Sequence, residues 1–303
     1  MDLQHIIDDI AAEITDQAVK IEQGADAKDE GVQPGPFGIA VATENAVFHA
    51  GASATTFPIQ SISKVLALEV AMRGVGDAVF KRVGREPSGD PFNSIIDLER
   101  TRGIPRNPFI NAGALVVVDL VIAGQEHENA VIDFVQAQLS GGTVELDDTV
   151  LAQGGDLNRA MLSFMKHHGN VVSPIDRIMD AYGKQCAISI DCVGLALAGR
   201  FLTRTRIDLK HDHHVERAQR MRTILALMMT CGHYDASGDF AVRVGLPAKS
   251  GVGGGVLAIA PERASVAVWS PNLDQHGNSM LGVRALEMLA ARTGWSVFGP
   301  AAT

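Results

Sequence analysis

The sequence predicts an α+β protein in which one antiparallel sheet is built from both ends of the chain and a helical region is inserted between them. Short β-prone runs occur near both ends, whereas the middle holds longer runs with helical periodicity. The turns between consecutive strands are too short for crossovers, so neighbouring strands should pair antiparallel. We expect a single unit over residues 1–303, with the sheet part at about 24–57 and 237–303 and the helical part at about 58–236.

The N-terminal end predicts a helix followed by a hairpin. From Leu3 to about Gln23, apolar residues recur at helical spacing behind Asp2, a possible cap. Phe37–Thr43 and Ala46–Ala50 then flank a tight turn at Glu44-Asn45, which is typical of two hairpin strands.

The rest of the chain predicts a long helical stretch, then strands and a last helix. Helical patterns separated by turn clusters fill the stretch from Pro58 to about Gly232. Three β-prone runs and a last helix follow, at Phe240–Ser250, Gly255–Ala260, Ala264–Trp269 and Ser279–Thr293. We expect a functional site where the sheet part meets the helical part.

Composition excludes several classes of protein. The 303 residues, 46% apolar and 20% charged, suffice for one large core or two modest ones. The net charge of −9 disfavours nucleic acid as a partner. The aromatic content is 5% and includes only two tyrosines, so an aromatic binding platform is not expected. Cys186, Cys192 and Cys231 form no CxxC pair, which indicates buried thiols in a reducing compartment and no metal site.

No segment predicts export or a membrane span. The first fifteen residues are acidic and lack the basic and apolar regions of a signal peptide. The longest apolar stretch, Gly113–Gly124, is about half the length of a membrane span and contains Asp119. We therefore expect a soluble, cytoplasmic protein.

The first motif with chemical content is Ser61-Ile-Ser-Lys64, which follows Pro58. At a spacing of three, both side chains lie on one face of a helix, and Ser61 is expected in its first turn. A desolvated lysine can deprotonate a serine, and the helix N-terminus stabilises an oxyanion. Taken alone, the pattern fits a capped helix with a solvated lysine better. However, the residues after Lys64 are apolar on every face, which indicates a buried helix and a buried lysine.

The second motif is Lys249-Ser250-Gly251, at the end of a β-prone run. In serine β-lactamases and penicillin-binding proteins such a triplet supplies a cationic edge to a Ser–Lys site. The glycines at 251–255 are not a phosphate loop, because a strand follows them where a phosphate loop requires a helix.

With their surroundings, these motifs resemble the glutaminases, a serine-dependent family with a β-lactamase/transpeptidase-like fold. The resemblance runs from Phe37 to Phe298. It is carried by Phe37-Gly-Ile-Ala-Val41, Ile59-Gln-Ser-Ile-Ser-Lys64, Gly84-Arg-Glu-Pro-Ser-Gly89, Phe92-Asn-Ser-Ile95, Asn107-Pro-Phe-Ile-Asn-Ala-Gly113, Cys231-Gly-His-Tyr-Asp235 and Gly245-Leu-Pro-Ala-Lys-Ser-Gly-Val-Gly-Gly-Gly255.

The resemblance implies roles for seven residues. The nucleophile falls on Ser61 and its base on Lys64, with a proton-relaying tyrosine at Tyr234. The substrate contacts fall on Asn111, Asn158 and Tyr182, and the oxyanion N–H falls on Val252. Without the resemblance, each asparagine would be read as a turn or cap residue and each tyrosine as core filler.

The resemblance further implies an amidohydrolase that converts L-glutamine to L-glutamate and ammonia through a Ser–Lys acyl-enzyme. Neither a metal nor another cofactor is implied, and the expected partners are the small-molecule substrate and further copies of the chain. The histidine-rich stretch His211-Asp-His-His214 is expected to be a polar loop rather than a metal site.

Two positions depart from the family pattern. The carboxylate that holds the substrate ammonium would fall near Gln153 or Gly154, so Asp156 is a possible substitute. The tyrosine of the family's Ala-Asp-Tyr-Ile-Pro block is absent from Gly24-Ala-Asp-Ala-Lys28. Two alternatives therefore stay open: a weakly active or non-catalytic amino-acid-binding homologue, and another cytoplasmic serine amidase, including one of the penicillin-recognising kind.

Overall fold

The computed structural model describes residues 1–25, 33–88, 95–124, 127–140, 142–205 and 212–299. The chain forms two compact units, one of residues 1–62 with 190–303 and one of residues 63–189. The second unit is shorter than the helical part expected over 58–236. Residues 190–236 belong with the sheet, since α9 (Cys192–Gly199) packs against its strands.

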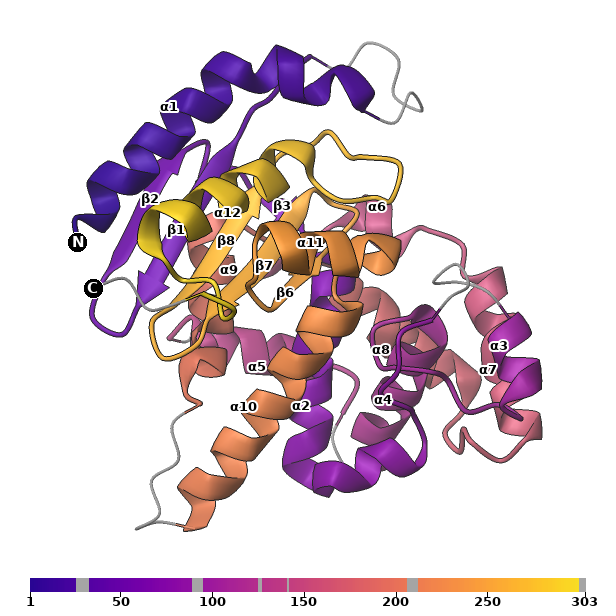
Figure 1. Cartoon of the computed structure of the whole chain (residues 1–303). Helices are drawn as coiled ribbons and strands as arrows, with labels where there is room; N and C mark the ends of the chain where they lie inside the picture. The colour runs from indigo at the N-terminus through magenta and orange to yellow at the C-terminus, as the bar shows by residue number, and fades with distance from the viewer. Residues whose placement is uncertain (26–32, 89–94, 125–126, 141, 206–211, 300–303) are drawn as a thin grey trace. The chain divides into compact units, whose positions relative to one another are not determined.

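The first unit is built on one five-stranded sheet made from both ends of the chain, as predicted (Figure 1). The order is β2-β1-β8-β7-β6, and every pairing in it is antiparallel. In the central register, Val266 of β8 lies opposite Val41 of β1 and Ala258 of β7. The strands are β1 (Gly38–Thr43), β2 (Val47–Gly51), β6 (Ala248–Ser250), β7 (Gly255–Ala260) and β8 (Ala264–Trp269).

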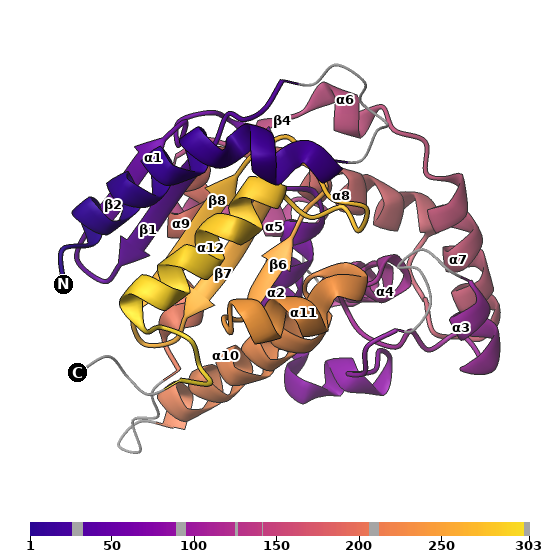
Figure 2. The same ribbon diagram turned by 45° about the horizontal axis from the view of Figure 1, so that its top comes forward.

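Helices cover both faces of this sheet. Helices α1 (Leu3–Ile21) and α12 (Met280–Thr293) pack side by side on one face (Figure 2). On the other face, Gly199 of α9 lies so close to Leu257 that an added Cβ would stand 2.5 Å from it. All residues of β7 and β8 are consequently buried, which explains why these strands are apolar except at Ser265. Asp2 caps α1, as the sequence suggested, and Ser279 caps α12.

One predicted strand is wrong over its first half. Phe240–Ser250 was expected to be extended, but Phe240–Arg243 belong to α11 (Ser237–Arg243) and only the end of the run is β6. The spacing of four between Phe240 and Val244 places both in the core beside α1 and α12. The helical period therefore buries this segment better than alternation would. The unit also contains β3 (Phe57–Pro58), α10 (Asp212–Cys231) and the 3-10 helices η1 (Glu22–Gly24), η3 (Gln60–Ile62), η5 (Arg200–Thr203) and η6 (Tyr234–Ala236).

The second unit is mainly helical, as expected for the middle of the chain. Its central helix α4 (Asn111–Ala123) is buried on nearly every side and packs against α2, α7 and α8. Leu115, Met161 and Ile178 lie in its core. The other elements are α2 (Ser63–Val75), η4 (Gly76–Lys81), α3 (Ile96–Arg100), α5 (Ala130–Gln138), β4 (Glu145–Leu146), α6 (Asp148–Leu151), α7 (Asp156–His167), α8 (Ile175–Ala187) and β5 (Ile188–Ile190).

The acid in the apolar stretch at 113–124 has a structural partner. Asp119 is fully buried and accepts hydrogen bonds from the guanidinium of Arg82 and from the amides of Val172 and Ser173. Burial by itself would raise the pKa of Asp119, but these hydrogen bonds outweigh it and hold the pKa below its usual value. Asp119 thus ties α4 to the segment before α8 as an ionised group.

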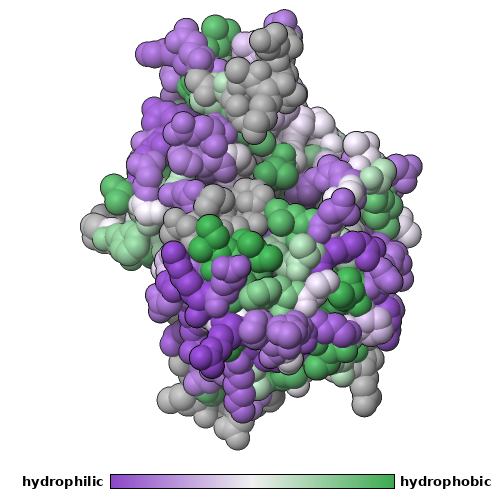
Figure 3. Space-filling model, turned by 90° about the vertical axis from the view of Figure 1, so that its right-hand side faces the viewer, coloured by the Kyte–Doolittle hydropathy of each residue, from purple (hydrophilic) through white to green (hydrophobic). Residues whose placement is uncertain are grey.

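The described residues include no helix long and apolar enough to cross a bilayer. On the face drawn in Figure 3, hydrophobic residues lie between hydrophilic ones, which is ordinary for a folded protein surface. All three cysteines are buried free thiols, as the composition indicated.

Candidate active site

Ser61 lies in a 3-10 turn that continues directly into α2. The α-helix itself begins at Ser63, so Ser61 precedes the helical turn in which it was expected. The difference arises at Gln60, whose φ of 48° is left-handed and incompatible with a regular α-helical start at this point. Ser61 is half-buried.

Lys64, the second residue of α2, is 1% exposed, which confirms the predicted burial. Its Nζ donates to the carbonyl of Phe109 over 3.2 Å and to Oδ1 of Asn111 over 2.7 Å. Burial lowers the pKa of Lys64 from 10.5 to about 8, although the neighbouring Cys186 thiol acts in the opposite direction. A measurable fraction of this lysine is therefore neutral near physiological pH.

The segment 107–113 presents both acceptors to Lys64. Asn107 is buried, and its Oδ1 accepts from the amides of Phe109 and Ile110 while its Nδ2 donates to the carbonyl of Glu86. A Cβ at Gly113 would stand 1.9 Å from the carbonyl oxygen of Asn107. Only glycine permits this approach, which fixes the start of α4 and the position of Asn111.

Asn111 also connects two other predicted substrate residues. The hydroxyl of Tyr182, on α8, donates to Oδ1 of Asn111 over 3.4 Å. Nδ2 of Asn111 donates to Oδ1 of Asn158, on α7, over 3.4 Å. Lys64, Asn111, Asn158 and Tyr182, which lie far apart in the sequence, thus form one polar network in the second unit.

Two further buried residues of α8, Gln185 and Cys186, were not assigned roles from the sequence. Gln185 donates from Nε2 to the hydroxyl of Ser63 over 3.3 Å, and the thiol of Cys186 lies 3.8 Å from the same hydroxyl. Burial raises the pKa of the Cys186 thiol, so it is held in the neutral form. The Tyr-x-x-Gln-Cys spacing was the available signal, since it places Gln185 and Cys186 one helical turn after Tyr182.

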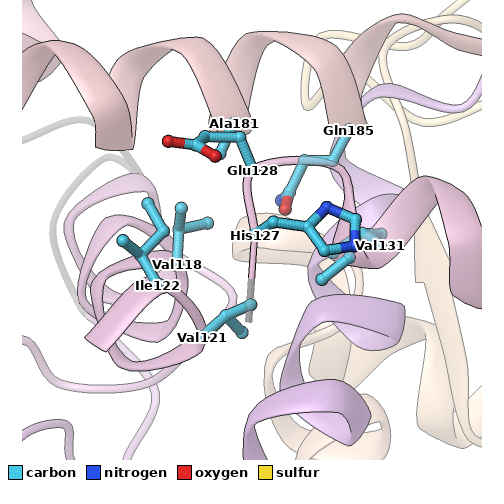
Figure 4. Close-up of a pocket in the computed structure, with 9 residues that line it drawn as sticks. Val118, Val121, Ile122, His127, Glu128, Val131, Ala181 and Gln185 are labelled. Carbon is cyan, nitrogen blue, oxygen red and sulfur yellow. The ribbon is translucent and has the colours of Figure 1, made fainter. Parts of the chain in front are cut away.

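A small cavity lies behind Gln185. Figure 4 shows Gln185 and His127 on one side of it, facing Val118 and Ile122 on the other. Its volume of about 10 Å³ is close to the room needed for one water molecule. The cavity is therefore too small to be a substrate site.

In the first unit, the glycines at 251–255 let their turn pack against the segment that carries Ser61. A Cβ would stand 2.6 Å from the carbonyl oxygen of Ile59 at Gly251 and 2.2 Å from that of Pro58 at Gly253. Val252, between them, is 44% exposed. Among the described residues, no acceptor takes a hydrogen bond from its amide N–H.

Lys249, on β6, is fully buried next to Tyr234. Its Nζ donates to the carbonyl of Ser250 over 2.6 Å and lies 4.4 Å from the centre of the Tyr234 ring. The hydroxyl of Tyr234 donates to the same carbonyl over 3.4 Å. Tyr234 has a left-handed φ of 53°, which is uncommon for an aromatic residue. The cation that the Lys249-Ser250-Gly251 motif predicted thus lies against the ring of Tyr234.

His233, the neighbour of Tyr234, is also buried. Its ring stacks on Phe240 with centroids 3.6 Å apart. Burial, together with the positive charge of Lys249, lowers the pKa of His233 to about 3. The imidazole is therefore neutral at physiological pH.

Of the two positions that depart from the family pattern, only the one at residues 153–154 lies within the described residues. Gln153 is exposed, and Asp156 is an exposed residue in the first turn of α7. The N-cap of α7 is Gly155, so Asp156 is not the capping residue. Position 27, where the family's additional tyrosine would fall, lies outside the described residues, as does His211. The prediction of a loop is wrong for residues 212–214, which form the start of α10. Within the described residues, no group of three potential metal ligands occurs.

The fold and these side chains define a class of protein. A buried lysine three residues after a serine, together with a Lys-Ser-Gly strand on an antiparallel sheet, is the arrangement of a β-lactamase-like serine hydrolase. A family model described as Glutaminase matches residues 30–298. The chain belongs to the glutaminase family.

Relatives cover the chain almost completely. A glutaminase of Methylobacterium radiotolerans is 50% identical across 98% of this chain and 99% of its own length. The solved structure of a probable glutaminase, ybaS, superposes with a TM-score of 0.84 at 34% identity, over 98% of this chain and 99% of that one. The covalent complex of the Bacillus subtilis glutaminase YbgJ with 5-oxo-L-norleucine superposes with a TM-score of 0.78 at 27% identity, over 96% and 99% of the two chains.

Proposed function

We propose that this protein hydrolyses the side-chain amide of L-glutamine to L-glutamate and ammonia through an acyl-enzyme on Ser61. The observation that carries the proposal is the buried Lys64, whose pKa falls to about 8 and whose Nζ is held by Asn111. The covalent 5-oxo-L-norleucine complex of the Bacillus subtilis relative supports a nucleophile in this family, because that adduct formed by reaction of the protein with 6-diazo-5-oxo-L-norleucine.

In the first step, neutral Lys64 takes the proton of the Ser61 hydroxyl as the oxygen attacks the amide carbon. The spacing of three residues supports this proposal, because residues three apart on a helical turn lie on the same face. The N–H groups of Ser61 and Val252 bind the oxyanion that develops on the amide oxygen. The exposed Val252 amide, without an acceptor in the described part of the chain, is suited to this task.

In the second step, the carbon–nitrogen bond breaks and Tyr234 passes a proton to the departing ammonia. Lys249 and the Ser250 carbonyl hold the tyrosine ring and hydroxyl in place. Water then attacks the acyl carbon and gives a proton to the Tyr234 oxygen. As the bond to Ser61 breaks, Lys64 returns its proton to the serine oxygen, and glutamate leaves. No metal or organic cofactor enters any of these steps.

Asn111, Asn158 and Tyr182 bind the amino-acid end of the substrate. Amide and hydroxyl groups provide both donors and acceptors, which match the α-carboxylate and the α-ammonium. The long contacts of 3.4 Å among them suit groups that exchange these partners for a ligand. With Gln153 exposed in place of a carboxylate, amide oxygens must hold the ammonium.

We further propose that residues 1–303 act as one catalytic unit, since the family match at 30–298 spans both compact units. The proposed setting is the cytoplasm, because the three thiols are free and buried. The proposed assembly is a homo-oligomer, as the resemblance implies.

The experiment is ammonia release from L-glutamine by the whole chain. Ser61→Ala should reduce the rate by several orders of magnitude, whereas Ser63→Ala, a buried serine two residues away, should retain most of it. Equal rates for wild type and Ser61→Ala would contradict the proposal.

The exposed Gln153, at the place of the family's carboxylate, favours one competing function, an amino-acid-binding homologue without turnover. Calorimetry separates the two, because tight glutamine binding without ammonia release would identify a sensor. Turnover of nitrocefin in place of glutamine would instead identify a penicillin-recognising amidase.

A further inference from the structure

A second pocket, rich in arginine, lies entirely within the first unit. Its volume is about 380 Å³, within the range of small-molecule sites. Its charged lining consists of Glu44, Arg200, Arg204, Arg217, Glu262 and Arg263. Four arginines against two glutamates leave the described part of the lining positive by two charges, although the whole chain carries −9.

The sheet register separates this pocket from the residues proposed for catalysis. Thr43 and Ala260 both lie opposite Ala264, so the β1–β2 turn and the β7–β8 turn share one end of the sheet (Figure 1). The glycine turn at 251–255 precedes the first residue pairs of β7, at the opposite end. The six residues of β7 span roughly 17 Å at about 3.3 Å per residue. The pocket is thus a distinct site.

The four guanidinium groups have no partner in the described part of the chain. None of them makes a side-chain hydrogen bond or an ion pair with another described residue. Nε of Arg217 is moreover buried without an acceptor. A buried N–H without a partner costs free energy, and four unpaired cations around one pocket repel each other. Both costs are removed when an anion binds.

The wall of the pocket is held in a fixed conformation. Glu262 has a left-handed φ of 62°, and its amide donates to the carbonyl of Thr203 over 2.9 Å. Its carboxylate accepts from the hydroxyl of Thr205, whose carbonyl accepts from Arg222 of α10 over 3.1 Å. These bonds join the β7–β8 turn to η5 and α10, so arginines from separate elements are already assembled.

We propose that this pocket binds a small, multiply charged oxyanion, either a phosphate-bearing compound or a polycarboxylate. Guanidinium groups form paired hydrogen bonds with phosphate and carboxylate oxygens alike. The described lining is polar throughout and includes no aromatic ring, so the pocket has no surface for stacking a nucleobase. Glu44 and Glu262 disfavour long polyanions and suit a compact ligand that also carries hydroxyl groups.

Calorimetric titration of the full-length protein with inorganic diphosphate and, separately, with citrate tests the proposal and distinguishes the two sources. At least one of them should bind with a Kd below about 1 mM at 0.15 M salt, and acetate should not. Arg217→Gln and Arg263→Gln should each weaken binding about tenfold or more, because each removes a charged hydrogen-bond donor. Glu44→Gln should strengthen binding.

Arg284→Gln is the matched control. It removes the same charge from α12, where Arg284 pairs with Glu287 outside the pocket, and should leave the affinity unchanged. Melting temperatures verify that each variant folds, and Arg263→Gln alters only an exposed turn. The proposal is overturned if neither anion binds, or if folded Arg217→Gln and Arg263→Gln bind as wild type does. It is also overturned if the arginine variants dissociate an oligomer while anion binding is absent, because the pocket is then a protein contact.

Discussion

Nζ of Lys64 lies 2.7 Å from Oδ1 of Asn111, and each residue stands in the first turn of its helix. This contact joins the residue proposed as base to a residue proposed to bind substrate. A ligand that displaces the present contacts of Asn111 would therefore also change the hydrogen bonding of Lys64. The geometry links substrate binding with the protonation of the base.

The pH dependence follows from the lowered pKa of Lys64. Below pH 8 the lysine is mostly protonated and cannot accept the serine proton, whereas above it the neutral form dominates. We expect kcat/KM for glutamine to rise with pH, with a midpoint near 8 and a tenfold decline per unit well below it. Lys64→Arg should be inactive from pH 6 to 10, because arginine does not deprotonate in this range. A flat wild-type profile between pH 6.5 and 9 would argue against Lys64 as the base.

The two tyrosines should affect different kinetic parameters. Tyr234→Phe removes a proposed proton donor, so kcat should fall by about 10²- to 10⁴-fold with little change in KM. Tyr182→Phe removes a hydroxyl from the Asn111 network, so KM should rise with a smaller effect on kcat. Steady-state kinetics on both variants distinguishes these effects. The same change in both parameters for both variants would refute the assignment.

Gly113→Ala should strongly destabilise the protein. The added methyl group would stand 1.9 Å from the Asn107 carbonyl oxygen, which is backbone and cannot move without shifting the start of α4. We expect the free energy of unfolding to fall by roughly 3 kcal/mol or more. The control is Gly74→Ala in α2, where nothing lies within 4 Å and alanine is the better helix former. Denaturant unfolding measures both, and an equal effect at the two positions would show that the close approach is unimportant.

The fold was predictable where the local pattern determines burial. The hairpin at 37–50, the strands at 255–269 and the last helix follow from β-prone runs, short turns and helical spacing. The prediction of a strand at Phe240–Arg243 was wrong. The apolar residues Phe240 and Val244 fit a strand locally, and only their packing in the tertiary core favours the helical spacing. Gln60 likewise gives no local sign of its left-handed backbone.

The sequence predicted which residues belong to the candidate site, but not the contacts among them. Burial of Lys64 follows from the apolar residues after it, but its acceptors at Phe109 and Asn111 lie at and just before the start of α4, 45 or more residues away. The motif at 249–251 indicated a cation, yet its contact with the Tyr234 ring depends on the left-handed turn at 234. The arginine pocket gathers residues from 44 to 263, and no local motif connects them.

The buried Asp119–Arg82 pair should contribute to stability in a pH-dependent manner. Because the pKa of Asp119 is lower in the folded than in the unfolded protein, its contribution is present above the usual value of 3.8 and is lost as pH falls through the folded pKa. Asp119→Asn removes the carboxylate that balances the charge of Arg82, which keeps only its neutral acceptors on Asn170, and should cost about 3 kcal/mol at pH 7. Glu287→Gln breaks two surface pairs, with Arg243 and Arg284, and should cost about 1 kcal/mol or less. Unfolding in urea at pH 7 and pH 3 measures both, and an Asp119→Asn protein as stable as wild type at pH 7 would exclude this role.

The most direct test of the proposed acyl-enzyme chemistry is mass spectrometry of the protein after reaction with 6-diazo-5-oxo-L-norleucine. We expect one covalent adduct, on the peptide containing Ser61, with fragmentation placing it on Ser61 in the wild type and in Ser63→Ala. Ser61→Ala should remain unmodified under the same conditions. An adduct on another residue, or modification of Ser61→Ala at the wild-type rate, would contradict Ser61 as the nucleophile.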